Sequence, residues 1–522
     1  MKISISKKYL TFPVNINAVS KKVCFFENGE LIFDFDCKID MRQPNFTAYV
    51  DVERFMGKTV DITVSPKMNV DIGMTNEMDM TLYGKEELRP KVHFTVLNGW
   101  NNDPNGLIKY NGRYHMFYQH NPCSTQWGNM QWGHAVSTDL LHWEHKDVAL
   151  FPDKNGTMYS GCAIEDVNNV SCISKLSDKP MLVYYTAAGG KNKLSGDKKY
   201  DQWLAYSIDN GETLVKFGDK PLVPTINAGN RDPKVVWVEE LNKYIMALYM
   251  MGNKYSFFTS DDLTSWTHYG DFEIEEESEC PDIFSFCVDG EKLWVLMGAS
   301  DIYVVGKFTD DGFVVLQKPK RLTYSRVNYA AQSFSGIDDG RVVRVSWQRI
   351  SIPNSRFSQQ MSIPTEMNLE KQDGEYFLTA LPIRELQTLY DKQFNYEGKI
   401  TEKPLRFDVG EDPIDVKFSI KNTDAASYTV MLFGMPLTVN FKDGFIQFKT
   451  TKMPFVKNGD LLDIRLIADR CTLDVFASSG KYNFAEFNIW DYNLPYIEFS
   501  ASTSIESIKI ECNTLRSIYE ND

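Results

Sequence analysis

Three acidic side chains stand next to prolines in aromatic or apolar surroundings, where carboxyl groups are able to do chemistry. Asp103 lies in "WNNDPNG", Asp232 in "GNRDPKVVW" and Glu279 in "ESECPDIF". Because proline fixes the backbone dihedral φ, a carboxylate beside it is held at a set angle. Two carboxyl groups, one ionised and one protonated, are the machinery that cleaves glycosidic bonds, and a third can hold substrate hydroxyls.

The neighbours of two of these residues predict opposite protonation states. Glu279 ends an acidic run and leads into the apolar Ile283 and Phe284. A carboxyl group at such a border should have a raised pKa and can act as a general acid. Arg231, beside Asp232, should keep that carboxylate ionised.

Each of the three residues also has a purely structural interpretation. The tetrapeptide Asp103 to Gly106 is one that tight β-turns favour, and Asp-Pro at Asp232 is a routine turn start. The run "EIEEESECPD" around Glu279 is typical of a solvated acidic loop. The surrounding sequence has to decide between turns and chemistry.

The composition narrows the classes of partner and cofactor. The 522 residues carry a formal net charge of −14, which disfavours a nucleic acid or an anionic membrane but does not repel a neutral substrate. The sequence contains no glycine-rich phosphate loop and no Gly-x-Ser-x-Gly motif. His142 and His145 lack the further ligands that a metal site needs, so we expect neither a metal nor another cofactor.

Cysteine usage and the first residues bear on location. Nine cysteines, an odd number without a Cys-x-x-Cys pair, fit reduced thiols better than a disulfide framework. The opening "MKISISKKYLTFPVNINAV" has no long apolar run, so we expect neither a signal peptide nor a transmembrane helix. We therefore predict a cytoplasmic protein, with its oligomeric state left open.

Short β-rich runs separated by turn dipeptides must position the carboxylates. "LIKYNGRYHMFYQ" predicts a hairpin around Asn111-Gly112. "VSTDLLHW" (136–143), "TSDDLTSW" (259–266) and more loosely "YSIDNGETL" (206–214) form a weak repeat, which favours β-propeller blades over coincidental turn chemistry. Each carboxylate precedes a strand-like run, at the point where the strands of a propeller converge on its central channel.

The all-β pattern divides into three predicted domains. Residues 1–88 indicate a small N-terminal β-domain, and residues 89–385 the propeller. Residues 395–522 alternate apolar and polar side chains, which is typical of a β-sandwich.

Seven motifs occur in an order that resembles glycoside hydrolase family 32, which comprises invertases, exo-inulinases, levanases and related β-fructosidases. They are "WNNDPNG", "MFYQHNP", "WGNMQWGHAVSTDLLHWEH", "YSG", "RDPKV", "ECPDIF" and "YAAQSF". The opening "KKYLTFPVN" resembles the extra leading domain of some bacterial levanases. The resemblance implies a five-bladed β-propeller followed by a C-terminal β-sandwich, with the N-terminal β-domain in addition.

The resemblance also implies roles for single residues. Asp103 corresponds to the nucleophile, Glu279 to the general acid/base, and Asp232 to the stabiliser that hydrogen-bonds fructose hydroxyls. The positions that would line the fructose pocket are Asn102, Gln119, Trp127, Ser160, Arg231 and Trp347. Asn101 and Tyr159 depart from the family pattern, which usually has Met and Phe there.

The implied activity is retaining hydrolysis that releases terminal β-D-fructofuranosyl units from sucrose, fructo-oligosaccharides or fructans such as inulin and levan. One alternative is fructosyl transfer through the same covalent intermediate. Another is a catalytically silent fructan-binding propeller, which would be expected to lack one of the three carboxylates. The preferred substrate and the role of the N-terminal domain do not follow from the sequence.

Overall fold

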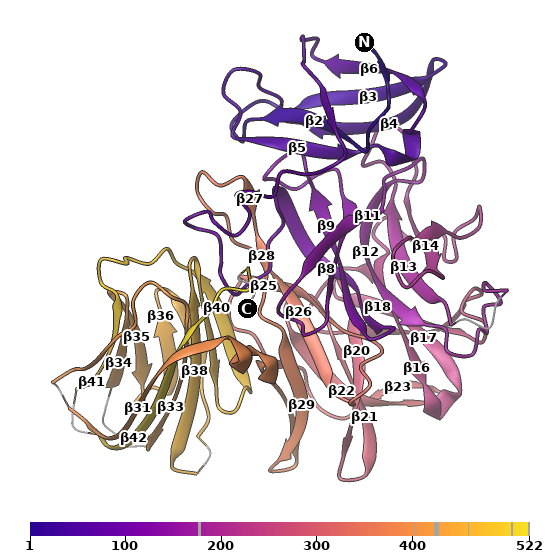
Figure 1. Cartoon of the computed structure of the whole chain (residues 1–522). Coiled ribbons are helices and arrows are strands. Elements are labelled where there is room, and N and C mark those ends of the chain that lie inside the picture. Colours follow the sequence, from indigo (N-terminus) through magenta and orange to yellow (C-terminus); the bar gives the residue numbers. More distant parts are fainter. Residues whose placement is uncertain (176–178, 402, 422–426, 458, 503–504, 520–522) are drawn as a thin grey trace.

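The structure is a computed structural model that describes residues 1–175, 179–401, 403–421, 427–457, 459–502 and 505–519. Strands dominate these residues from one end to the other (Figure 1). Their helical segments are three short 3-10 helices, η1 (Glu53–Phe55), η2 (Glu239–Leu241) and η3 (Arg384–Leu389). The all-β fold class predicted from the sequence is therefore confirmed.

Two sheets form the N-terminal part of the chain, drawn in indigo in Figure 1. Their strand orders are β1-β6-β3-β4 and β5-β2-β7. The strands are β1 (Lys2–Ser4), β2 (Tyr9–Val14), β3 (Lys21–Glu27), β4 (Glu30–Cys37), β5 (Phe46–Asp51), β6 (Thr59–Ser65) and β7 (Gly73–Thr75). Buried Phe12, Phe25 and Phe35 pack together from both sheets, so this part has a hydrophobic core of its own.

The next described residues form five sheets, each built mainly from strands that follow one another in the chain. The first two contain β8 (Gly99–Tyr110), β9 (Arg113–Asn121), β10 (Gln131–Ser137), β11 (Glu144–Leu150), β12 (Thr157–Glu165), β13 (Met181–Ala188), β14 (Tyr200–Ser207) and β15 (Val215–Lys216). The third and fourth contain β16 (Arg231–Val238), β17 (Lys243–Met251), β18 (Lys254–Ser260), β19 (Thr267–Glu273), β20 (Asp282–Val288), β21 (Glu291–Met297), β22 (Ile302–Thr309), β23 (Gly312–Val315) and β24 (Lys320–Arg321). The fifth contains β25 (Asn328–Ser333), β26 (Val342–Gln348), β28 (Gln360–Met361), β29 (Thr365–Gln372) and β30 (Glu375–Pro382).

The first strands of these sheets form a closed ring. β8 contacts β12, β12 contacts β16, β16 contacts β20, β20 contacts β25, and β25 contacts β8 again. β27 (Phe357–Ser358) closes the ring, because it follows the fifth sheet's β26 in the chain but pairs with β8 of the first. Such a ring is the arrangement of a β-propeller. The five sheets are consistent with the five blades that the resemblance implies, and the blade count itself stays a prediction.

The weak sequence repeat is one turn that recurs in three successive sheets. A serine hydroxyl donates to the aspartate two residues later in the pairs Ser137–Asp139, Ser207–Asp209 and Ser260–Asp262. Each turn follows the third strand of its sheet, which is β10, β14 or β18. The predicted hairpin is also confirmed, since Tyr110 pairs with Arg113 across Asn111-Gly112.

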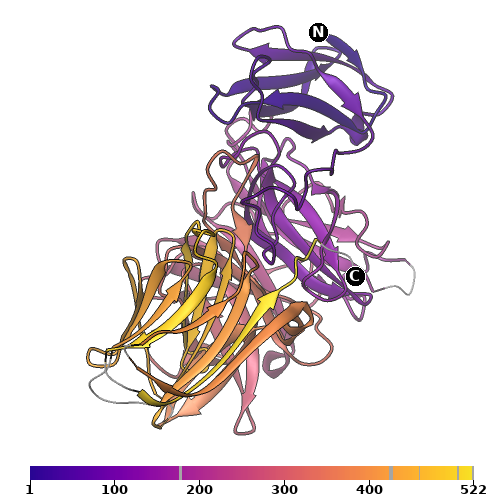
Figure 2. The ribbon, with the colours of Figure 1, turned by 60° about the vertical axis from the view of Figure 1, so that its left-hand side comes forward.

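Two six-stranded sheets form the C-terminal part, drawn in orange to yellow in Figure 2. One contains β31 (Tyr390–Ile400), β42 (Ile505–Leu515), β33 (Ile414–Lys421), β38 (Leu461–Asp469), β39 (Thr472–Ala477) and β40 (Tyr482–Phe487). The other contains β32 (Leu405–Asp408), β41 (Tyr496–Ala501), β34 (Ser427–Leu432), β35 (Met435–Asn440), β36 (Phe445–Phe448) and β37 (Thr451–Pro454). Buried side chains from both sheets share one core, as in a β-sandwich. β31 begins at Tyr390, ahead of the sandwich start predicted at residue 395.

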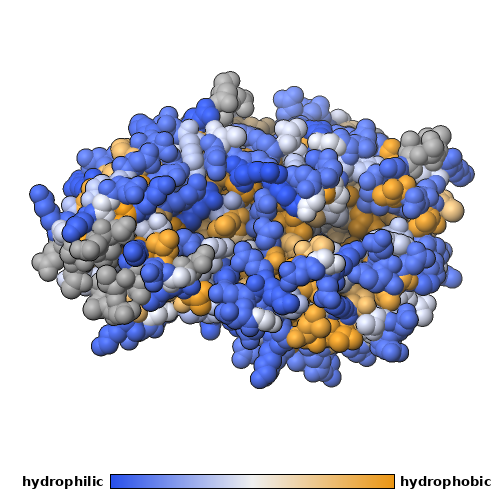
Figure 3. All heavy atoms as spheres, turned by 90° about the horizontal axis from the view of Figure 1, so that it is seen from below, coloured by the Kyte–Doolittle hydropathy of each residue, from blue (hydrophilic) through white to orange (hydrophobic). Residues whose placement is uncertain are grey.

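The surface is mostly hydrophilic, with smaller apolar patches between the charged side chains on the face seen in Figure 3. Such scattered apolar exposure is ordinary for a globular protein. Within the residues that the structure describes, no helix is long and apolar enough to cross a membrane.

Candidate active site

The ring of first strands brings the predicted site residues together. Asp103 lies in β8, Ser160 in β12 and Asp232 in β16, while Glu279 precedes β20. Because β8 begins at Gly99, Asp103 stands inside a strand, and the tight-turn interpretation of this tetrapeptide is wrong. Residues far apart in the sequence therefore meet at one place on the ring.

Irregular pairing at the beginnings of these strands aims the side chains. The pairing register breaks between Asn101 and Pro104 in β8, Tyr159 and Gly161 in β12, and Arg231 and Lys234 in β16. The first break encloses Asn102 and Asp103, the second Ser160 and the third Asp232, and β-bulges re-aim side chains next to active sites in this way. Asp232 and Glu279 also adopt positive φ values of 63° and 54°, which non-glycine residues rarely do.

All of the predicted residues except Ser160 line one cavity of about 340 Å³. The complete lining is Asn102, Asp103, Gln119, Trp127, Tyr159, Tyr200, Arg231, Asp232, Glu279, Cys280, Tyr329 and Trp347. Ser160 is buried behind this wall and acts on it through hydrogen bonds. The cavity therefore combines carboxyl, amide and aromatic groups, a mixture that suits a neutral polar ligand such as a sugar.

A chain of hydrogen bonds orients the Asp103 carboxylate. Ser160 donates to its Oδ2 at 2.6 Å, and Asn102 donates to its Oδ1 at 3.2 Å. Gln119 fixes both donors, since it accepts from Asn102 at 2.5 Å and donates to Ser160 at 2.8 Å. Burial raises the pKa of Asp103, and the hydrogen bonds from Ser160 and Asn102 oppose that rise because they stabilise the ionised form.

The protonation of Asp232 differs from the sequence-based expectation. Burial raises the pKa of Asp232 to about 7, and Arg231 only partly opposes this rise, so the low pKa expected from the neighbouring arginine is not found. The nearby Glu279 and Asp103 charges add to the rise. Arg231 Nε lies 3.5 Å from Asp232 Oδ2, a distance too long for a strong hydrogen bond.

Arg231 instead serves Glu279. Its Nη2 donates to Glu279 Oε1, while the Tyr329 hydroxyl donates to Oε2 at 2.5 Å. The guanidinium of Arg349 lies over the Tyr329 ring, 4.2 Å from its centroid. The side chain of Glu279 is only 33% exposed, so it belongs to the cavity and not to a solvated acidic loop.

Sequence reasoning missed two residues that touch the carboxylates. The Cys280 thiol lies 3.6 Å from Asp103 Oδ2 and 3.6 Å from Asp232 Oδ2, and its backbone N–H donates to Asp232. Tyr329 comes from β25, a first strand that supplied no predicted residue. Their position inside "ECPDIF" and "YAAQSF" was a signal that could have found them.

The arrangement can perform acid–base and nucleophilic chemistry on a sugar. Asp103 has donors that stabilise its ionised form, and Glu279 lines the same cavity with part of its side chain exposed to solvent. Among the described residues, no group of three or more His, Cys, Asp or Glu side chains has the arrangement of a metal site.

Comparison with known proteins identifies several similar chains. A levanase of Bacillus subtilis (strain 168) is 31% identical over 486 residues, which cover 82% of this chain and 70% of that protein. The fructan beta-fructosidase of Streptococcus mutans is 30% identical, with 83% of this chain but only 33% of that protein covered. The crystal structure of exo-inulinase from Aspergillus awamori superposes with a TM-score of 0.75 at 22% identity, covering 83% of this chain and 99% of that one.

The structural likeness confirms the fold of a propeller followed by a β-sandwich. Residues 93–380 match the model of the glycosyl hydrolases family 32 N-terminal domain. This range contains every residue that lines the cavity. The chain therefore belongs to glycoside hydrolase family 32 and is a glycosidase.

Proposed function

We propose that the protein is a retaining β-fructofuranosidase that releases terminal, non-reducing fructosyl units from fructans and sucrose. The observation that carries this proposal is the meeting of Asp103, Asp232 and Glu279 in one cavity together with amide and aromatic side chains. A pair of carboxyl groups in one cleft is the equipment of a glycosidase. The names of the relatives, a levanase and a fructan beta-fructosidase, supply the class of sugar.

In the proposed first step, Asp103 attacks the anomeric C2 of the fructosyl unit while the protonated carboxyl of Glu279 gives its proton to the leaving oxygen. Oδ2 of Asp103 accepts from the Ser160 hydroxyl and the Cys280 thiol, whereas Oδ1 has, among the described residues, only the longer bond from Asn102. We therefore assign the attack to Oδ1. The products of this step are a fructosyl ester on Asp103 and the free leaving group.

In the second step, the now ionised Glu279 takes a proton from water, which attacks C2 and frees fructose with its original configuration. We assign the binding of fructose hydroxyls to Asp232, a role supported by its position in the cavity lining beside the Cys280 backbone N–H. Retention requires the carboxyl groups of Asp103 and Glu279 to lie about 5–5.5 Å apart when the sugar is bound.

Hydrolysis is favoured over transfer because the relatives named above are hydrolases. The silent binding propeller is disfavoured because all three carboxylates are present.

The test is to measure initial rates on sucrose, inulin and levan for the purified protein and for Glu279→Gln. The substitution should lower the rate by about 10²–10⁴-fold, because the leaving oxygen loses its proton donor. Glu276→Gln is the matched control, since this residue of the same acidic run is exposed and does not line the cavity. Wild-type protein that released no fructose from any of the three substrates, or a Glu279→Gln variant with normal turnover, would contradict the proposal.

A further inference from the structure

Strand β4 of the N-terminal sheets packs against two connections of the propeller that lead to the cavity. One connection, residues 122–130, joins β9 to β10 and carries Trp127. The other, residues 189–199, joins β13 to β14 and runs directly into Tyr200. Both aromatic residues line the candidate active site. The N-terminal strand β4 therefore contacts the two segments that carry or precede these cavity residues.

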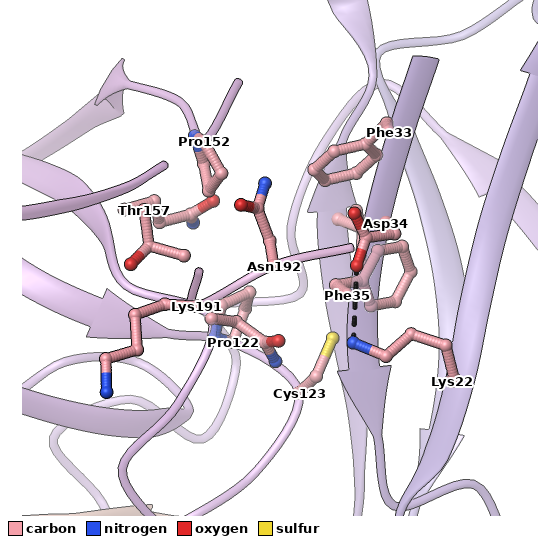
Figure 4. Close-up of a pocket in the computed structure, with 13 residues that line it drawn as sticks. Lys22, Phe33, Asp34, Phe35, Pro122, Cys123, Pro152, Thr157, Lys191 and Asn192 are labelled. Carbon is pink, nitrogen blue, oxygen red and sulfur yellow. Dashed lines mark hydrogen bonds and ion pairs between the residues drawn. The ribbon is translucent and has the colours of Figure 1, made fainter. Parts of the chain in front are cut away.

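The contact between β4 and these connections is close. Figure 4 shows Phe33, Asp34 and Phe35 on one side and Cys123 and Asn192 on the other. The space left between them measures about 20 Å³, room for about one water molecule. A shift of β4 would therefore be transmitted to both connections.

The Asp34 side chain binds the backbone of the second connection. Its carboxylate oxygens accept hydrogen bonds from the backbone N–H groups of Lys193 and Leu194, both at 2.9 Å. The side chain is buried, and Lys22 of the neighbouring strand β3 balances its charge with a contact of 3.2 Å, marked in Figure 4. Hydrogen bonds to a buried, ionised acceptor are among the stronger ones in proteins.

Asn129 holds the first connection in a similar way. Its side-chain amide accepts from the Asp36 backbone N–H at 2.8 Å and donates to the Asp36 carbonyl oxygen at 2.6 Å. The same amide donates to Asn121 Oδ1 at 3.0 Å, and Asn121 in turn donates to the Gln126 carbonyl oxygen. The segment on either side of Trp127 is thereby tied to β4 of the N-terminal sheets.

The two connections meet in a row of aromatic rings along the cavity. The Trp127 ring packs edge-on against Tyr159 with centroids 6.0 Å apart, and Tyr159 packs against Tyr200 at 5.4 Å. We call Trp127, Tyr159 and Tyr200 the aromatic wall. Trp127 is 49% exposed, so packing leaves about half of its surface uncovered.

We infer that the N-terminal domain is a positioning element of the active site, which holds the aromatic wall in place through Asn129 and Asp34. This inference rests on the proposed function in that the wall is taken to contact the sugar. A wall that contacts the sugar throughout the reaction contributes equally to ground-state and transition-state binding, so its loss raises KM and leaves kcat nearly unchanged.

The direct test is Asn129→Gly in the full-length protein. Asn129 has a positive φ of 49°, which glycine adopts without strain, so the substitution removes the two bonds to Asp36 and the bond to Asn121 without straining the backbone. We expect KM for sucrose and levan to rise about 3–10-fold, with kcat within about twofold of the wild type. Asp34→Asn, which removes the charge and one acceptor, should act in the same direction.

Tyr9→Phe is the matched control. It removes a hydrogen bond between the N-terminal sheets and Asp147 in β11, away from the aromatic wall, and should leave KM unchanged. Hydrogen exchange followed by mass spectrometry gives a readout independent of activity. Peptides covering residues 122–130 should exchange faster in Asn129→Gly and remain as in the wild type in Tyr9→Phe.

A double-mutant cycle with Trp127→Ala separates positioning from general weakening. If Asn129 acts through Trp127, Asn129→Gly has no further effect on KM once Trp127 is removed. Multiplying effects, equal effects of Asn129→Gly and Tyr9→Phe, or unchanged exchange over residues 122–130 would overturn the inference. A wild-type protein that released no fructose would overturn the proposed function instead, and the exchange experiment would still decide the positioning role.

Discussion

Asp232 is the most deeply buried of the three carboxyl groups at the site, with 6% of its surface exposed. Burial raises its pKa from an ordinary 3.8 to about 7. The folded protein therefore binds a proton here, between about pH 4 and pH 7, that the unfolded chain releases. Raising the pH through this window lowers the free energy of unfolding, and this destabilisation by the buried Asp232 is fully present above pH 7.

At the residue scale we therefore predict that Asp232→Asn stabilises the protein at pH 8. The free energy of unfolding should rise by roughly 2–4 kcal/mol relative to the wild type, and the difference should shrink towards pH 4. Urea denaturation at pH 4, 6 and 8 measures this. Asp262→Asn is the control with the opposite sign, because burial, which would raise the pKa of Asp262, is outweighed by hydrogen bonds from Thr264, Ser265 and Ser260 that together lower it. A difference that stayed constant with pH would contradict the assignment.

The residues of the site are more predictable from sequence than its electrostatics. Asp103 and Glu279 are identified because their neighbours form recognisable motifs. Which carboxylate Arg231 contacts depends instead on how β16 and the segment before β20 come together, and the adjacent Asp232 proves to be the weaker partner. The two contacts of Cys280 likewise join three sheets, which no local pattern encodes.

At the scale of elements, the break in β12 depends on a glycine. A Cβ on Gly161 would lie 1.9 Å from the Tyr184 carbonyl oxygen of β13. No flexible side chain can yield there, since the obstacle is backbone. Gly161 follows Ser160, the donor to Asp103, so a displaced strand also moves the nucleophile.

Gly161→Ala should therefore lower the free energy of unfolding by about 1–3 kcal/mol, as overpacking does, and reduce the hydrolysis rate as well. Thermal unfolding and initial rates on sucrose provide the measurements. Gly270→Ala in β19 is the matched control, because a Cβ there meets nothing within 4 Å. Equal stability of the two variants would contradict this prediction, because it would mean that β12 accommodates a Cβ at position 161.

Hairpins and recurring turns are elements that local sequence encodes, as Asn111-Gly112 and the Ser-x-Asp turns demonstrate. The register breaks that place Asp103, Ser160 and Asp232 were not predicted. A break of this kind arises where one strand must satisfy both its partner and the ring of first strands. Nothing within a window of a few residues specifies that requirement.

At the scale of the whole molecule, His93 joins the propeller to the sandwich. Its ring nitrogens contact Asp469 at 2.8 Å and Asp474 at 3.0 Å, and all three side chains are buried. Burial alone would lower the pKa of His93, but the two carboxylates outweigh it and raise that pKa to about 9. The contribution of the charged His93 to the free energy of unfolding is therefore fully present below about pH 6.5 and is lost as the pH rises through 9.

We expect His93→Gln to lower the free energy of unfolding by roughly 3–5 kcal/mol at pH 6, because buried carboxylates lose their counter-charge. The loss should be smaller at pH 10, where the wild-type imidazole is neutral as well. His268→Gln serves as control, since that exposed histidine pairs with Asp271 at the surface and should matter little. Chemical denaturation at both pH values decides; an equal loss at pH 6 and pH 10 would contradict a charged His93.

The order of the large parts is visible in the sequence, because each has its own alternation of apolar residues and its own motifs. How the parts act on one another is not. The contacts of Asp34 and Asn129 with partners on another part of the chain depend on the packed surfaces of two folded units. For this reason the N-terminal domain had no assignable role before the structure.

We predict that Asp103 forms a covalent bond to fructose during turnover. In Glu279→Gln, activated fructosyl donors with a good leaving group should still transfer their fructosyl group to Asp103, while breakdown of the ester slows because the general base is missing. Mass spectrometry of peptides from the rapidly quenched reaction should then find one fructosyl group on the peptide that contains Asp103. A fructosyl group on any other residue, or product released at normal speed without a trapped ester, would contradict the account.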